Sequence, residues 1–203
     1  MSREEYLGYW KRETNRNYVK NLDIADLELK LPPHVFDPDP EITYSTSIIL
    51  DNFPEVKGKT VLDLGTGSGI IAMNSSRQGA KLCVGSDIDT KVLRAAKVNI
   101  ERNELHKEVI LIWSNLFQNI YSSFDIIFAN LPIWDEQTFE THMELLQSYK
   151  RHLNEGGELW MSYASFGDKR MNSSFLMQNH QLKEVFEVTR FGINWSLFVL
   201  KGD

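Results

Sequence analysis

Cysteine and long apolar runs are both scarce in this sequence. Its 203 residues include one cysteine, Cys83, so a single chain can form neither a disulfide nor a cysteine-based zinc site. No apolar run approaches the roughly 20 residues that span a bilayer, and the charged first residues lack the apolar segment of a signal peptide. We therefore expect a cytoplasmic protein in which Cys83 is a buried structural thiol.

Basic residues are outnumbered by acidic ones. Lysine and arginine total 22 against 28 for aspartate and glutamate, which gives a net charge of −6. Such a surface is a poor match for bare nucleic acid, because binding normally depends on basic side chains that neutralise phosphates. A local basic face can still exist on an acidic protein. The five histidines are scattered without metal-ligand spacing, so no metal site is predicted.

Apolar segments alternate with helical patterns from residue 60 onward. Because 42% of the residues are hydrophobic, the chain can build one domain with a full core. Strands are expected at 60–64, 82–86, 109–113, 124–129, 158–163, 183–190 and 193–200, and helices at 70–78, 90–103, 138–152 and 173–180. This order predicts the α/β class, with one Rossmann-like, doubly wound sheet that is mostly parallel and has an antiparallel C-terminal edge.

The first 35 residues are expected to form an arm, and residues 36–203 the main domain. Residues 1–30 are polar with scattered aromatic side chains, which we interpret as one or two short helices. They would either pack on the domain or form a flap over a substrate. Residues 31–40 are rich in proline and predict an extended link. A helix is expected to begin with Asp39 as its cap and Pro40 in its first turn, and to end at Pro54.

A glycine-rich turn follows the first strand of the main domain. Residues 61–69 read Val-Leu-Asp-Leu-Gly-Thr-Gly-Ser-Gly, so a buried strand runs into a turn that opens a helix. Ligands bind at this edge of open α/β sheets. The turn lacks the GxxxxGK[ST] pattern of phosphate-binding loops, and its GxGxG spacing differs from the GxGxxG of dinucleotide sites. Asp63, two residues before the first glycine, also favours a cationic ligand over a pyrophosphate.

A second acid, Asp87, ends the next strand, 18 residues after Gly69. A carboxylate there can accept hydrogen bonds from both hydroxyls of a ribose. A ribose joined to a cationic tail without phosphate describes S-adenosylmethionine. The sequence therefore predicts S-adenosylmethionine as the cofactor.

Four motifs, in family order, resemble those of the class I S-adenosylmethionine-dependent methyltransferases. They lie at 61–69, 84–89, 114–117 and 130–132, and the resemblance covers about residues 36–200. It implies the seven-stranded methyltransferase fold. Within the class, the chain is most similar to small-domain methyltransferases, which include release-factor glutamine and ribosomal-RNA guanine N-methyltransferases.

The resemblance also implies which residues bind the cofactor. Asp63 would face its methionine end, and Asp87 would hold its ribose. Ile88 and Leu116 would flank the adenine, and Asn115, where many relatives carry an acid, would accept a hydrogen bond from the adenine amino group through its amide oxygen. The turn would let the cofactor approach the backbone closely at Gly65, Thr66, Gly67 and Gly69.

The fourth motif contains the candidate catalytic residues Asn130, Leu131 and Pro132. The Asn130 side-chain oxygen and the Leu131 carbonyl could each accept a hydrogen bond from one of the two N–H groups of an amide or exocyclic amine. These bonds would align the nitrogen with the methyl group and favour the charge that builds on it. Pro132 keeps Leu131 in the extended region. Asn130 is also expected to contact the cofactor.

This turn departs from the pattern of amino-methylating relatives, which carry Pro-Pro followed by an aromatic residue. Leu131 replaces the first proline, and Ile133 replaces the aromatic residue that usually stacks on a planar substrate. Trp134 is the candidate substitute for that stacking. Substrate choice is expected to depend on residues 1–45 and on the loops near Trp134 and at 165–172.

We therefore predict an S-adenosylmethionine-dependent methyltransferase that modifies a nitrogen of a protein or RNA acceptor. Two alternatives stay open. The missing Pro-Pro-aromatic pattern favours a small-molecule acceptor, and a weakened catalytic turn beside an intact cofactor site would suit an inactive scaffold subunit. The sequence indicates neither the acceptor nor the oligomeric state.

Overall fold

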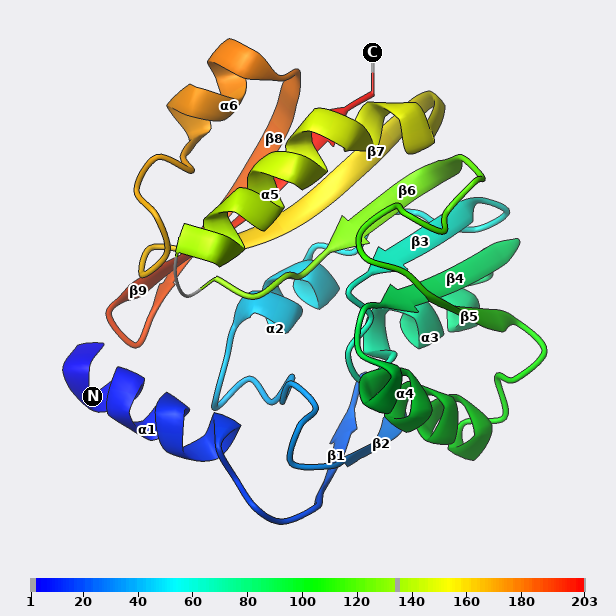
Figure 1. The fold of residues 1–203 in the computed structure, drawn as a ribbon, viewed down its shortest axis with the longest axis vertical. Helices are drawn as coiled ribbons and strands as arrows, with labels where there is room; N and C mark the ends of the chain where they lie inside the picture. The colour runs from blue at the N-terminus through cyan, green and yellow to red at the C-terminus, as the bar shows by residue number, and fades with distance from the viewer. Residues whose placement is uncertain (1–2, 134–135, 203) are drawn as a thin grey trace.

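The computed structural model describes residues 3–133 and 136–202, and these contain a seven-stranded sheet flanked by helices (Figure 1). The helices are α1 (Arg3–Thr14), α2 (Ser45–Asp51), α3 (Ile70–Arg77), α4 (Thr90–Arg102), α5 (Glu136–Ser148), the 3-10 helix η1 (Tyr149–His152) and α6 (Ser173–Asn179). The strands are β1 (Lys20–Ile24), β2 (Leu27–Leu31), β3 (Thr60–Leu64), β4 (Leu82–Asp87), β5 (Val109–Trp113), β6 (Phe124–Ala129), β7 (Leu153–Ala164), β8 (Leu182–Arg190) and β9 (Ile193–Lys201).

The strand order of the sheet is β5-β4-β3-β6-β7-β9-β8. Strands β3 to β7 pair in parallel, and β9 runs antiparallel to both β7 and β8. In Figure 1, α2, α3 and α4 lie on one side of the sheet, and α5 and α6 lie on the other. The predicted doubly wound sheet with an antiparallel C-terminal edge is confirmed. The chain reverses its direction of travel across the sheet between β3 and β6, where open α/β sheets bind ligands.

Strand β6 lies in the middle of the core. Ile126, Ile127, Phe128 and Ala129 are each at most 1% exposed, which agrees with a strand covered on both faces. Cys83 in β4 is also buried, as expected, and burial raises the pKa of its thiol to about 12. Among the described residues, no helix has the length and apolar composition needed to cross a membrane.

The expectation of short helices over residues 1–30 is right only for α1. Residues 20–31 instead form an antiparallel hairpin of β1 and β2. Leu27, Leu29 and Leu31 are buried against α3 and α4, whereas the residues between them are exposed. This alternation with a period of two is that of a half-buried strand. The turn residues Ala25 and Asp26 both have positive φ, as tight hairpin turns require.

Helix α2 begins later than expected, at Ser45. The Asp39 side chain accepts a hydrogen bond from the Glu41 N–H at 2.9 Å, and its carbonyl accepts from the N–H groups of Ile42 and Thr43. Asp39 therefore closes a separate turn instead of capping the helix, because its side chain bonds two residues ahead as in an Asx turn.

Helix α1 is attached to the far end of the sheet through aromatic contacts. The Tyr6 ring stacks on Phe191 with centroids 4.8 Å apart and meets the edge of Trp195 at 6.4 Å. The Tyr6 hydroxyl donates to the Ile42 carbonyl. Helix α1 thereby links the β8–β9 turn to the segment that leads into α2.

A buried ion-pair cluster holds the link between β2 and α2. The Arg16 guanidinium lies 3.5 Å from the Asp37 carboxylate, and Lys20 contacts Asp37 at 3.1 Å and Asp39 at 2.6 Å. Arg16 is 6% exposed and Asp37 is 1% exposed. Arg16 also donates to the backbone carbonyls of Leu31, Pro32 and Val35. Asp37 therefore neutralises the Arg16 guanidinium, which in turn holds the backbone of the link through hydrogen bonds.

Replacing Asp37 by alanine should destabilise the fold. The change leaves the Arg16 charge buried without its partner, and breaking a buried pair in this way typically costs about 3 kcal/mol. Urea unfolding followed by circular dichroism measures the loss. Asp23→Ala, at an exposed position of β1, is the control and should change the free energy of unfolding by less than about 0.5 kcal/mol. Equal effects of the two substitutions would contradict a stabilising role for the cluster.

Candidate functional site

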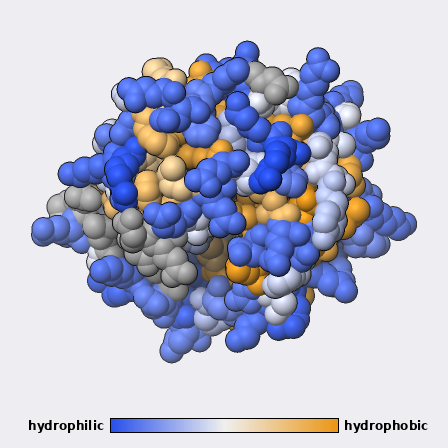
Figure 2. Space-filling model, turned by 45° about the horizontal axis from the view of Figure 1, so that its top comes forward, coloured by the Kyte–Doolittle hydropathy of each residue, from blue (hydrophilic) through white to orange (hydrophobic). Residues whose placement is uncertain are grey.

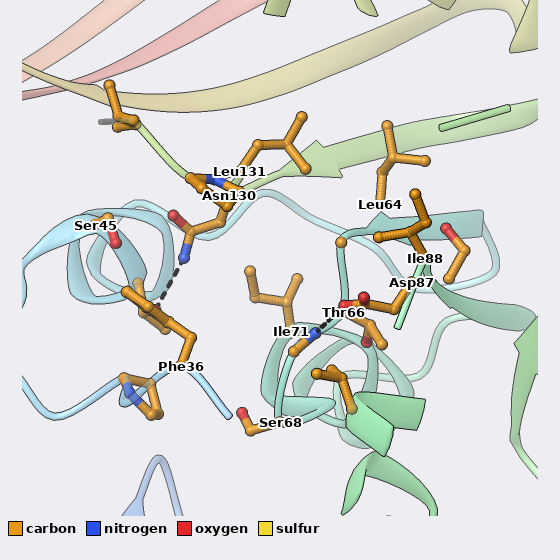
Figure 3. A pocket seen from close by; sticks show the side chains of 18 of the residues that line it. Phe36, Ser45, Leu64, Thr66, Ser68, Ile71, Asp87, Ile88, Asn130 and Leu131 are labelled. Carbon is orange, nitrogen blue, oxygen red and sulfur yellow. Dashed lines mark hydrogen bonds between the residues drawn. The ribbon is translucent and has the colours of Figure 1, made fainter. Parts of the chain in front are cut away.

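A cavity of about 390 Å³ lies at the carboxyl ends of β3, β4 and β6 (Figure 3). One wall is built by the glycine turn and the end of β4, and another by residues 130–133 after β6. The remaining lining comes from the segment 34–46, from α3, α4 and α5, from residues 114–116, from Phe166 and from Trp195 in β9. The predicted site residues in the lining are Gly65, Thr66, Gly67, Asp87, Ile88, Asn115, Leu116, Asn130, Leu131 and Pro132.

The glycine turn is fastened to the end of β4. The N–H groups of Gly65 and Thr66 both donate to the Ser86 carbonyl at 2.8 Å. Gly65 has φ of 75°, and a Cβ there would lie 2.6 Å from Cδ2 of Leu131. The positive φ therefore favours glycine at this position, and a larger residue would also have to displace the end of the Leu131 side chain. Gly69 precedes α3 in the left-handed conformation and lies outside the lining.

Asp63 lies beneath the turn and outside the cavity lining. Its side chain is 1% exposed and accepts hydrogen bonds from the Thr66 hydroxyl at 2.6 Å and the Ala72 N–H at 3.1 Å. Burial raises the pKa of Asp63 to about 6, and these two bonds oppose the shift. In this geometry Asp63 holds the turn to α3, and its role toward a methionine group stays a prediction.

Asp87 presents its carboxylate to the cavity. One oxygen accepts from the Gly67 N–H at 3.2 Å, and the other accepts from the Asp89 N–H at 3.0 Å. Burial raises the pKa of Asp87, and the backbone hydrogen bonds oppose it. Each carboxylate oxygen can accept more than one bond, so the pair can still receive two neighbouring hydroxyls.

Apolar surface adjoins Asp87 at the cavity mouth. Ile88 is 58% exposed. Figure 2 shows one face of the molecule, which is mainly hydrophilic with some hydrophobic side chains at the surface. The Trp113 ring N–H donates to the Ile88 carbonyl at 2.8 Å and so ties the ends of β4 and β5. Leu116 is buried, with φ of 44°, and the Ser114 hydroxyl donates to its carbonyl. Asn115 is exposed between them.

The candidate catalytic turn faces this region across the cavity. Asn130 Nδ2, from which a dashed line runs in Figure 3, donates to the Thr46 hydroxyl at 3.0 Å. Asn130 Oδ1 accepts from the Ser162 hydroxyl at 2.7 Å. Leu131 is 8% exposed and Pro132 is exposed. Trp134, the candidate stacking residue, lies outside the described residues.

The cavity also has lining residues that were not assigned from the sequence. His34, Phe36, Thr43, Ser45 and Phe166 fall within the segments expected to govern substrate choice. Outside those segments, the further lining side chains from α2, α5 and β9 are Thr46, Thr138, Thr141 and Trp195. The run of hydroxyl residues at 43–47 was a usable signal, whereas a tryptophan inside an apolar strand gives none. Among the described residues, the lining contains neither lysine nor arginine.

Asn99 in α4 connects the cavity wall to the amino-terminal hairpin. Its buried side chain accepts from the Lys30 N–H at 2.7 Å and donates to the Ser68 carbonyl at 2.9 Å. One amide thus joins β2 to the glycine turn.

The chain resembles known methyltransferases in both sequence and fold. A family model described as methyltransferase small domain matches residues 26–193. The chain is 31% identical to a Methanocaldococcus jannaschii protein named for protein N5-glutamine methylation. The alignment spans 125 residues and covers 60% of each chain. It is 33% identical over 165 residues to ribosomal RNA small subunit methyltransferase C of Haemophilus influenzae, which covers 80% of this chain and 47% of that protein.

A similar solved structure is that of a Thermus thermophilus 16S rRNA N2 G1207 methyltransferase in complex with AdoMet and guanosine. The TM-score is 0.66 at 20% identity, over 91% of this chain and 50% of that one. At 20% identity, this similarity shows that the two proteins share a fold. The chain spans about half to three-fifths of the length of these curated relatives.

Asp63→Asn should make folding stability less sensitive to pH. Because the pKa of Asp63 is raised from 3.8 to about 6 in the folded protein, its protonated form contributes stability below pH 4 that is lost as the pH rises through about 6. At about 1.36 kcal/mol per pKa unit, the free energy of unfolding of the wild type relative to Asp63→Asn should fall by roughly 2 kcal/mol between pH 4 and pH 7. Urea unfolding without cofactor measures this difference. A constant difference would contradict the raised pKa.

Proposed function

This chain belongs to the methyltransferase small domain family, and we propose that it transfers the methyl group of S-adenosylmethionine to a nitrogen of a protein or RNA acceptor. The observation that carries the proposal is that the turn of residues 130–132 and the Asp87 carboxylate line one cavity. The relatives named for glutamine and ribosomal-RNA methylation support this class of reaction.

The residues present fit the cofactor. The Asp87 oxygens suit a ribose, the exposed Ile88 and buried Leu116 offer apolar surface to an adenine, and the turn at Gly65 and Gly67 leaves room at the backbone. The AdoMet bound in the Thermus thermophilus structure supports the choice of this cofactor. When bound, S-adenosylmethionine supplies a methyl group activated by a positively charged sulfur.

Asn130 and Leu131 would hold the acceptor nitrogen. A carbonyl oxygen has two lone pairs, so Asn130 Oδ1 can accept from Ser162 and from one N–H of the acceptor together. The Leu131 carbonyl would accept the second N–H. These two bonds orient the nitrogen lone pair and stabilise the positive charge that develops on the nitrogen, which loses a proton after methylation.

The charge of the lining bears on the acceptor. A described lining without lysine or arginine offers no counter-charge to a phosphate, so the group that enters should be neutral, as an amide or an exocyclic amine is. A small-molecule acceptor is the second candidate, which Leu131 and Ile133 favour because they replace the usual proline and aromatic residue.

Transfer of a labelled methyl group tests the proposal. The protein is incubated with S-adenosylmethionine labelled in its methyl group and with separate protein, RNA and metabolite fractions. Label in the protein or RNA fraction supports the proposal, and label confined to metabolites supports the second candidate. Tight binding of S-adenosylhomocysteine without label in any fraction would contradict both and favour an inactive scaffold.

Asp87→Ala should weaken binding of S-adenosylhomocysteine at least tenfold, equivalent to about 1.4 kcal/mol, because it removes the acceptor of the ribose hydroxyls. Isothermal titration calorimetry measures the affinity. Asp89→Asn, which removes a neighbouring charge but keeps the α4 cap acceptor, should stay within about twofold of the wild type. Unchanged affinity in Asp87→Ala would contradict the ribose assignment.

Asn130→Ala should lower turnover about a hundredfold, the effect typical of losing a preorganised polar group. Affinity for S-adenosylhomocysteine should stay close to that of the wild type, since most of the residues proposed to bind the cofactor, Asp87 among them, lie on the opposite wall. Initial rates of label transfer at saturating cofactor measure the turnover. Wild-type turnover in this variant would show that the chemistry takes place elsewhere.

A further inference from the structure

The side-chain amide of Asn130 is held at both ends by hydroxyl groups. Thr46, the second residue of α2, accepts from Nδ2 at 3.0 Å, and Ser162 in β7 donates to Oδ1 at 2.7 Å. Thr46 lies 84 residues and Ser162 32 residues from Asn130 along the chain. The fold therefore brings three separate segments together around one amide.

Both hydroxyl groups are shielded from water. Thr46 is 1% exposed and Ser162 is 0% exposed. Asn130 itself is half-buried, so it is the buried Thr46 or Ser162 hydroxyl that has little solvent to replace a lost bond to the amide. A hydroxyl can donate or accept, so the two contacts hold the plane of the amide between α2 and β7. In the structure Nδ2 faces Thr46 and Oδ1 faces Ser162.

In this orientation the Asn130 oxygen can still accept a hydrogen bond from a group in the cavity. Oδ1 keeps one lone pair beyond its bond to Ser162, and this lone pair is the acceptor needed for a substrate N–H. If the amide turned, an N–H donor would face the substrate N–H instead, and the two donors would repel. Orientation of Asn130 is therefore as important as its presence.

We propose that Thr46 and Ser162 are positioning residues that orient Asn130 for methyl transfer. The proposal rests on the proposed function of Asn130 in holding the acceptor nitrogen. Neither residue needs to touch the acceptor for this role.

Substitution of Thr46 tests the contact with matched side chains. Thr46→Val keeps the shape but removes the hydroxyl, and should lower kcat about tenfold with KM for S-adenosylmethionine within about twofold, the scale of losing one positioning hydrogen bond. Thr46→Ser restores the hydroxyl and should recover most of kcat. Ser162→Ala should lower kcat in the same way. Wild-type kcat in Thr46→Val, or an equal loss in Thr46→Ser, would overturn the proposal.

A double-mutant cycle distinguishes positioning from general weakening of the fold. If Thr46 acts through Asn130, the pair Thr46→Val and Asn130→Ala should be no slower than Asn130→Ala alone. Independent, multiplying losses would overturn the proposal. Ser148→Ala is the control, because it removes a hydroxyl that bonds the Glu144 carbonyl outside the cavity lining, and it should leave kcat unchanged.

A measurement that does not depend on methyl transfer tests this inference separately from the proposed function. The Asn130 side-chain amide resonances, assigned in a 15N NMR spectrum by their loss in Asn130→Ala, should exchange faster with solvent in Thr46→Val and not in Thr46→Ser. If the wild type transfers no methyl group but this response is seen, the proposed function fails and the orientation of Asn130 is upheld. Unchanged exchange in Thr46→Val would overturn the inference whatever the activity.

Discussion

The buried carboxylate of Asp63 is the contact on which the ligand cavity depends. It binds the Thr66 hydroxyl and the Ala72 N–H, and so joins the glycine turn to the first turn of α3. Thr66 in turn donates its N–H to the Ser86 carbonyl, one residue before Asp87. The position of the Asp87 carboxylate beside the turn thus follows from a charge buried beneath it. The raised pKa of Asp63 is the electrostatic cost of that arrangement.

The parallel part of the fold could be predicted because its signals are local. Strands such as β6 are short apolar runs, and glycines follow helices α3 and η1 closely enough to show where elements end. The hairpin of β1 and β2 was missed for the opposite reason. Its three leucines are spread through a polar segment, and their burial arises from α3 and α4, which lie more than 35 residues further along the chain. Tertiary contact, more than local preference, decides such a segment.

The residues of the candidate site also fall into those with a local sequence signal and those without one. The glycine turn, Asp87 and Asn130 could be found because each lies at the end of a strand or directly after it, and the ends of parallel strands meet at one edge. The lining residues near Asn130 from other elements could not be found in this way. Thr46 and Trp195 reach the cavity from α2 and from the antiparallel β9, and no spacing in the sequence relates them to Asn130. Side chains that orient a reacting group are chosen by three-dimensional proximity, which a one-dimensional pattern does not carry.

The bridging amide of Asn99 has a consequence for where the folding unit begins. A fragment that started at residue 36 would lack the Lys30 N–H that bonds the Asn99 oxygen beside the turn. It would also expose to water the surface of α3 and α4 that the leucines of β2 cover. The hairpin therefore supports the wall of the ligand crevice. Shortening the chain from its amino terminus would first displace the backbone at Ser68, whose carbonyl Asn99 binds.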